Sequence, residues 1–167
     1  HIDEKDKFKT VGEYFGFYQQ NGFYKAGEPV ICILGGNGGG SLEGLIKALE
    51  SENCNVIAVS GLWPGEAVMQ EISPDLVIYQ PHGRLGEEAV AYLKQQNVPL
   101  FCPLKVTQEY EDFLKDQQGM TGGMLSQSIT MPELDGGTVP FVLSALFRNE
   151  RGLLEFRMLP DRLERFA

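Results

Sequence analysis

The sequence is poor in cysteine and histidine, with three cysteines and two histidines among 167 residues. The odd cysteine count argues against a disulfide framework, and the absence of a Cys-x-x-Cys motif argues against a dedicated structural zinc site. We therefore expect Cys32, Cys54 and Cys102 to be small core residues of a protein in a reducing compartment. This use of cysteine predicts a cytoplasmic protein.

Positive charge and long apolar runs are also scarce. Fourteen basic side chains stand against twenty-three acidic ones, which gives a formal net charge of −9 and makes nucleic acid an unexpected partner. No apolar run approaches the roughly 18 residues of a membrane span. The charged start, residues 1–9, does not fit a signal peptide. Because the chain begins with His1 and not with methionine, we expect a segment excised from a longer protein.

Short apolar runs alternate with amphipathic segments along most of the chain. We expect strands over residues 29–34, 55–60, 76–79 and 98–102, and helices over residues 42–52, 64–72, 86–96 and 107–115. This alternation predicts an α/β fold with a mostly parallel, Rossmann-like sheet, of flavodoxin-like order, and helices on both faces. Further strands are expected over residues 128–131, 139–147 and 153–158, the last two as a hairpin, before a helix that Pro160 opens.

The N-terminal region is rich in aromatic side chains. A helix over residues 9–20 is expected within a helical extension that covers residues 1–28, and residues 29–167 are expected to form a single α/β domain. The simplest role of the aromatic helix is to pack on that domain. A different class of function is a non-catalytic docking module that uses the same segment to pack on neighbouring domains.

The candidate site centres on the segment Met131-Pro132-Glu133-Leu134-Asp135-Gly136-Gly137, which lies between two apolar runs. Its two carboxylates are expected on a turn at the end of a buried strand, where open α/β sheets carry their chemistry. A purely structural turn is the alternative, because Asp tolerates turn geometry and Gly adopts positive φ.

Two further loops should follow the first and third strands at the same edge of the sheet. The first, Gly35–Gly40, contains Asn37, and the second contains His82 and Arg84. Both loops would meet the acidic turn in one crevice. The glycine-rich loop also allows a nucleotide-binding domain, although it matches neither the Walker motif nor the dinucleotide fingerprint. His82 is either a proton carrier or ligand, or a solvated loop residue.

Three methionines flank the acidic turn and would give either a soft apolar wall for a flat ligand or ordinary core filling; they are Met120, Met124 and Met131.

One long segment of the chain runs from Pro103-Leu104-Lys105-Val106-Thr107 through Glu109-Tyr110 to Met131-Pro132-Glu133-Leu134-Asp135-Gly136-Gly137-Thr138-Val139-Pro140. This segment resembles the large subunit of the cobaltochelatase and magnesium chelatase family. In that family a Pro-Leu strand end and a helix lead to a Leu-Pro-Glu-Leu/Val-Asp-Gly turn, followed by a proline and an apolar strand. The order of the upstream α/β units is also similar, so that the resemblance covers nearly the whole chain.

The resemblance implies a domain of a metal chelatase, a ligase that forms metal–nitrogen bonds in porphyrin or cobalamin metabolism. The substrates would be a tetrapyrrole, either a porphyrin or a corrin, and a divalent ion of cobalt, magnesium or iron. Metal insertion and metal removal both remain open. The partners would be the remaining domains of the large subunit and ATPase subunits of the AAA+ type, which use ATP. We expect the excised domain to hold no tightly bound cofactor and to be inactive alone.

The resemblance also implies roles for particular residues. Glu133 and Asp135 would face the cleft, Glu133 as a base or a transient metal ligand, while Gly136 and Gly137 shape the turn and contact substrate. Asp135 has the alternative role of bonding the Gly136 and Gly137 amides.

The chain departs from the family pattern at two loops, where we expect contacts to the macrocycle. Asn37 lies where the family carries an Arg-x-His-like segment, and His82 and Arg84 lie where it carries small or hydroxyl residues.

Overall fold

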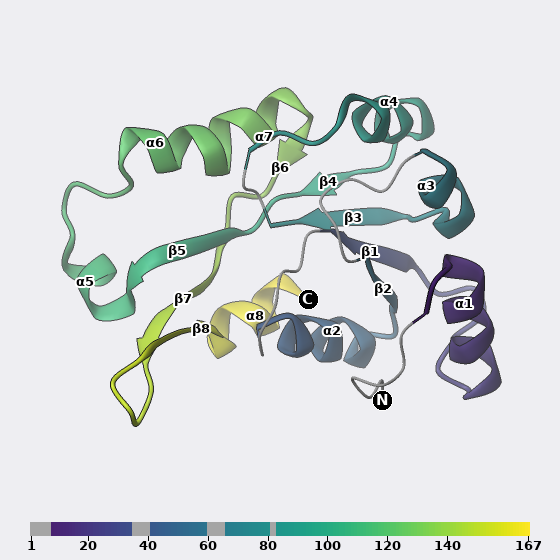
Figure 1. Ribbon diagram of the computed structural model, residues 1–167, viewed down its shortest axis with the longest axis horizontal. Helices are drawn as coiled ribbons and strands as arrows, with labels where there is room; N and C mark the ends of the chain where they lie inside the picture. The colour runs from purple at the N-terminus through teal and green to yellow at the C-terminus, as the bar shows by residue number, and fades with distance from the viewer. Residues whose placement is uncertain (1–7, 35–40, 60–65, 81–82) are drawn as a thin grey trace.

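A parallel five-stranded sheet forms the centre of the computed structural model, which describes residues 8–34, 41–59, 66–80 and 83–167. The strands are β1 (Val30–Leu34), β2 (Asn55–Val59), β3 (Leu76–Tyr79), β4 (Leu100–Phe101) and β6 (Gly137–Thr138). They lie in the order β2-β1-β3-β4-β6 (Figure 1). With β6 as the fifth strand of this sheet, the predicted flavodoxin-like order is confirmed.

Strand β1 shows why the sheet is covered on both faces. Ile31 and Ile33 point into one buried cluster, while Cys32 and Leu34 point into a second cluster on the other face. Strands that are buried on both sides read as continuous apolar runs, which is the pattern that the sequence has here.

Helices cover both faces, as predicted. On one face lie α2 (Ser41–Ser51) and α8 (Pro160–Phe166), which pack around Ile31 and Ile33. The other face is covered by α1 (Val11–Gln20), α3 (Glu66–Ile72) and α4 (Glu87–Gln96). Among the described residues, no helix has the length and apolar character needed to cross a membrane.

The aromatic N-terminal helix α1 packs on this same fold. Tyr18 is buried and its hydroxyl donates to the Glu50 carboxylate at 3.0 Å, while the Tyr14 hydroxyl donates to the Val56 carbonyl at 3.0 Å. Burial, followed by the charge of Glu50, raises the pKa of Tyr18 to about 12. The packing role predicted for this helix is therefore confirmed.

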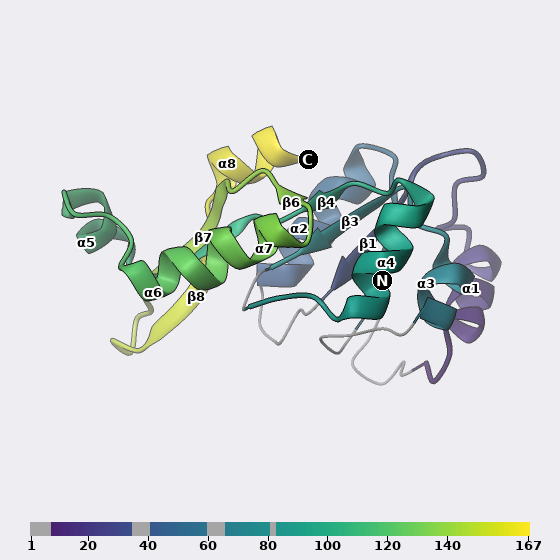
Figure 2. The ribbon, with the colours of Figure 1, turned by 90° about the horizontal axis from the view of Figure 1, so that it is seen from above.

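A second sheet of three strands extends away from the first. Its strands are β5 (Leu104–Glu109), β7 (Val142–Arg148) and β8 (Leu154–Met158), in the order β5-β7-β8. The β7–β8 pair is antiparallel, which confirms the predicted hairpin, whereas β5 and β7 are parallel. Figure 2 shows this sheet and α5 (Tyr110–Lys115) projecting to one side of the five-stranded sheet.

One helical segment joins the two sheets and differs most from expectation. It consists of α6 (Gly122–Leu125), the π-helix η1 (Ser126–Thr130) and α7 (Met131–Leu134). The strand predicted over residues 128–131 is therefore wrong, because those residues are helical. The β-branched and short polar residues of this stretch favour extended structure locally, but the helix packs over neighbouring elements instead.

Two other boundaries also differ from the predictions. The helix predicted over residues 107–115 begins only at Tyr110, because β5 continues to Glu109 with Leu104 and Val106 buried. The strand predicted over residues 139–147 is interrupted, since Val139 has φ +58° and the chain changes sheets before Val142.

Candidate functional site

The centre of the site is Asp135, a buried carboxylate directly after α7. Its Oδ1 atom accepts hydrogen bonds from Arg84 Nε at 2.9 Å and Nη2 at 2.5 Å, and its Oδ2 atom accepts one from the Leu85 backbone N–H at 2.7 Å. The side chain has no exposed surface. Asp135 therefore fixes the end of α7 to the segment that leads into α4.

These contacts differ from the bonds expected within the turn. The alternative role predicted for Asp135 is to bond the Gly136 and Gly137 amides, but the Gly136 N–H donates to the Glu133 carbonyl at 3.0 Å. The Leu85 amide was missed by sequence reasoning, because a backbone donor in a loop has no residue-type signal.

Arg84 is the cationic partner of this buried carboxylate. The hydrogen bond with Asp135, followed by the charge of that carboxylate, raises the pKa of Arg84, so that the guanidinium stays charged at neutral pH. About half of the side chain is exposed, at 53%. The structure thus brings together two of the predicted site residues, Arg84 and Asp135, and leaves part of the guanidinium open to solvent.

Glu133 differs from Asp135 in its surroundings. It lies in the first turn of α7, and its side chain is exposed. In the part of the chain that the structure describes, its carboxylate has neither a hydrogen bond nor an ion pair. The two carboxylates therefore differ in chemical availability, because both oxygens of Asp135 accept hydrogen bonds from the protein, whereas Glu133 has no donor among the described residues.

The two glycines meet different requirements. Gly136 has φ +92°, a conformation that side chains with a Cβ rarely adopt. Gly137 is buried, and a Cβ at this position would lie 2.7 Å from Cys102 Sγ and 2.8 Å from the Pro132 carbonyl oxygen. Both residues shape the turn, one through its backbone angles and the other through close packing.

The strand order corrects the predicted position of the acidic turn, residues 131–137, relative to the sheet. The acidic turn is predicted to follow the fifth strand at the carboxyl edge of the sheet, but it precedes β6, in which Gly137 pairs with Leu100 of β4. The turn therefore lies at the amino end of the last strand. Asn37, His82 and the Gly35–Gly40 loop lie outside the described residues, so their convergence with Glu133 stays a prediction.

A pocket of about 470 Å³ opens beside residues 135–136, at the amino end of β4. Asp135 and Gly136 form one wall, and the end of α4 and the start of β4 form the other, including Lys94 and Asn97. Its volume lies within the range of roughly 300–1,000 Å³ that is typical of small-molecule sites. Sequence reasoning missed this wall, because Lys94 and Asn97 read as an ordinary helix end.

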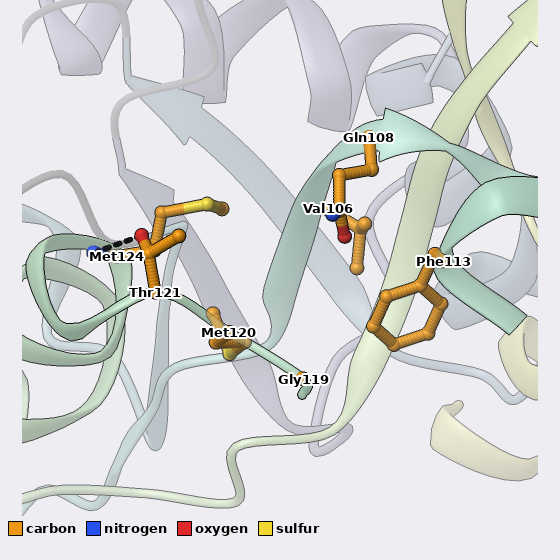
Figure 3. Close-up of a pocket in the computed structure, with 7 residues that line it drawn as sticks. All are labelled: Val106, Gln108, Phe113, Gly119, Met120, Thr121 and Met124. Atoms are coloured by element: carbon orange, nitrogen blue, oxygen red, sulfur yellow. Dashed lines mark hydrogen bonds between the residues drawn. The ribbon is translucent and has the colours of Figure 1, made fainter. Parts of the chain in front are cut away.

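The methionine-rich region forms a smaller pocket of about 100 Å³ between β5 and α6 (Figure 3). Met120 and Met124 line it, together with Val106, Gln108, Phe113, Gly119 and Thr121, but Met131 does not. The Thr107 hydroxyl lies 3.3 Å from Met124 Sδ. Because ligand pockets usually exceed about 300 Å³, this one does not enclose a flat macrocycle.

Within the described ranges, no group of three or more His, Cys, Asp or Glu side chains is arranged to hold a metal ion.

Comparison with known proteins gives one family and one related structure. The model of the family described as CobN/Magnesium Chelatase matches residues 1–167. The catalytic subunit of cobaltochelatase from Mycobacterium tuberculosis has a similar fold, with a TM-score of 0.62 and 20% sequence identity. That match covers 84% of this chain and 14% of the other, so the chain corresponds to a small part of that subunit. The comparison with curated proteins gives no match.

Proposed function

Because the chain belongs to the CobN/magnesium chelatase family, we propose that it is one domain of the tetrapyrrole-binding large subunit of a metal chelatase. Residues 29–167 would form the domain and residues 1–28 its extension. The observation that carries the proposal is the pairing of a free carboxylate, Glu133, with a saturated one, Asp135, inside the Pro-Glu-Leu-Asp-Gly-Gly element of a chain that matches the family along its whole length.

The chemistry of metal insertion suits this pair of carboxylates. Pyrrole N–H protons must leave the macrocycle while a hydrated divalent cation loses water. An exposed carboxylate accepts a proton or holds the cation for a short time through oxygen. Glu133 takes this role, since no described residue neutralises it. Metal removal, the reverse direction, would use the same carboxylate as a proton donor after protonation.

Asp135 and Arg84 contribute in a different way. Asp135 is a positioning residue, because its side chain is buried and both of its carboxylate oxygens accept hydrogen bonds from the protein. Arg84 is oriented by that carboxylate, and the open part of its guanidinium would bind a peripheral carboxylate of the macrocycle. Gly136, at the wall of the 470 Å³ pocket, would let the macrocycle approach the backbone closely. His82 and Asn37 are proposed as further contacts to the macrocycle.

The proposed assembly extends beyond this chain. The substrates would be a porphyrin or corrin and a cobalt, magnesium or iron cation, and the partners would be further domains of the subunit and AAA+-type ATPases that supply energy from ATP. The match covers 14% of the related subunit, which supports a subunit with further domains beside this one. A cytoplasmic location is supported by the three cysteines, all of which are unpaired.

Titration of tetrapyrroles tests the function directly. Porphyrins and corrinoids are added to the full-length subunit that carries this domain, and the Soret or corrin absorption bands are recorded. We expect a saturable shift with at least one of them, weakened when Arg84 is replaced by Met. A full set of titrations without any shift would contradict the proposal.

A further inference from the structure

The helix that carries Glu133 changes its hydrogen-bonding register just before the site. Within the π-helix η1, the Met131 N–H donates to the Ser126 carbonyl, five residues earlier. In a regular α-helix the same N–H would donate to the Gln127 carbonyl. The π turn therefore removes from Gln127 the donor that an α-helix would have supplied.

Pro132 explains why no other helix donor replaces it. Proline has no backbone N–H, so residue 132 donates neither to Ser128, its α-helical partner, nor to Gln127, its π-helical partner. The Gln127 carbonyl is thus released from the helix ladder. Gln127 is an exposed residue, so its released carbonyl can accept a hydrogen bond from water or from a donor in another segment of the chain.

The donor that it finds lies in the segment between β3 and α4. The Gly83 N–H donates to the Gln127 carbonyl at 3.3 Å, and Gly83 has φ +104°, which favours glycine. The next two residues, Arg84 and Leu85, are the ones that donate to Asp135. Three consecutive residues are therefore held from a single stretch of chain, residues 127–135.

We propose that Pro132 is a positioning residue. Because Pro132 has no N–H, the Gln127 carbonyl is left to accept from Gly83, and this bond is the first point of a two-point clamp on residues 83–85. Asp135 is the second point. One point would leave the segment free to pivot, whereas two points fix the direction of the Arg84 guanidinium. Glu133 lies between the clamp points in the sequence, so Glu133 and Arg84 are held in one unit. This inference rests on the proposed function where it assigns Arg84 to the macrocycle.

Replacement of Pro132 by Ala tests the clamp. The variant regains an N–H and permits the α-helical register, in which Gln127 is bonded within the helix and Gly83 loses its acceptor. We expect amide hydrogen exchange at Gly83 to become about five- to tenfold faster in the 167-residue chain, measured by NMR. Folding should be retained, because Ala is a better helix former than Pro. Tetrapyrrole affinity of the full-length subunit should fall about tenfold if Arg84 gives a charge-assisted contact.

The matched control is Pro160→Ala. Pro160 occupies the first turn of α8, where its missing N–H has no helix partner to lose, so exchange at Gly83 should stay unchanged. Unchanged exchange at Gly83 in Pro132→Ala would overturn the clamp, and faster exchange with unaltered tetrapyrrole affinity would overturn its positioning role. Exchange is read without tetrapyrrole, so failure of the unsubstituted subunit to bind any tetrapyrrole would count against the proposed function and not against the clamp.

Discussion

At the scale of single residues, two carboxylates that are neighbours in sequence have opposite environments. Asp135 is enclosed by donors from Arg84 and Leu85, and Glu133 projects into solvent. The sequence indicates an acidic turn with glycines that shape it. It does not indicate which of the two carboxylates forms an ion pair. Arg84 lies 51 residues from Asp135, so the pairing depends on the fold.

Replacement of Asp135 by Asn should destabilise the fold. The Asn amide would turn an NH₂ group toward Arg84 or Leu85, so that one buried donor loses its acceptor at a cost of about 1–3 kcal/mol. Urea unfolding followed by circular dichroism measures the change in the free energy of unfolding. Asp112→Asn is the control, since that carboxylate is exposed on α5, and it should change stability by less than about 0.5 kcal/mol. Equal stability of the two variants would argue against the role of Asp135.

At the scale of elements, the buried parallel strands are the most predictable part of the fold. The predicted bounds of β1, β2 and β3 agree with the structure to within a residue, because continuous apolar runs between turn residues have few other solutions. The helical segment of residues 122–134 was not predictable in the same way. Within it, the apolar run over residues 128–131 favours strand locally, and the path of the segment is set by packing and by the missing N–H of Pro132.

The approach of α7 to β6 gives a prediction at this scale. Gly137→Ala should cost about 1–3 kcal/mol, because the new Cβ would meet the buried Cys102 sulfur and the Pro132 carbonyl, and the two elements would have to separate. Thermal unfolding of Gly137→Ala and Gly123→Ala gives the comparison. Gly123 lies in α6 with open space around it, so its replacement should be neutral or stabilising. A Gly137→Ala variant as stable as the unsubstituted chain would mean that α7 is not closely packed on β6.

At the scale of the whole molecule, two cysteine thiols are buried in their neutral form, one on β1 and one after β4. Burial raises the pKa of the Cys32 thiol to about 12, and burial followed by the charge of Asp135 raises that of Cys102 to about 12. In the unfolded chain, thiols titrate at about 8.5. Each folded pKa is above its unfolded value, so the stability from these groups is complete below about pH 8.5 and is lost as pH rises toward 12.

The fold should therefore weaken in alkali. We expect the free energy of unfolding, measured by urea titration at several pH values, to fall steadily between about pH 9 and pH 12. Cys32→Ala removes one of the titrating groups, so its decline over this interval should be shallower even though its stability at pH 7 is lower. A pH-independent free energy of unfolding across this range would contradict the burial of these groups.

The claim that most needs testing is that Glu133 is the free carboxylate of a metal chelatase. The direct measurement is the rate of metal insertion into a tetrapyrrole by the full-length subunit with its ATPase partners, for Glu133→Gln and for Glu164→Gln. Glu164 is an exposed glutamate of α8 and serves as the control. We predict that Glu133→Gln lowers the rate at least about 100-fold while tetrapyrrole binding is retained, because the proton acceptor is lost. A Glu133→Gln enzyme that inserts metal at the rate of the Glu164→Gln enzyme would contradict the account.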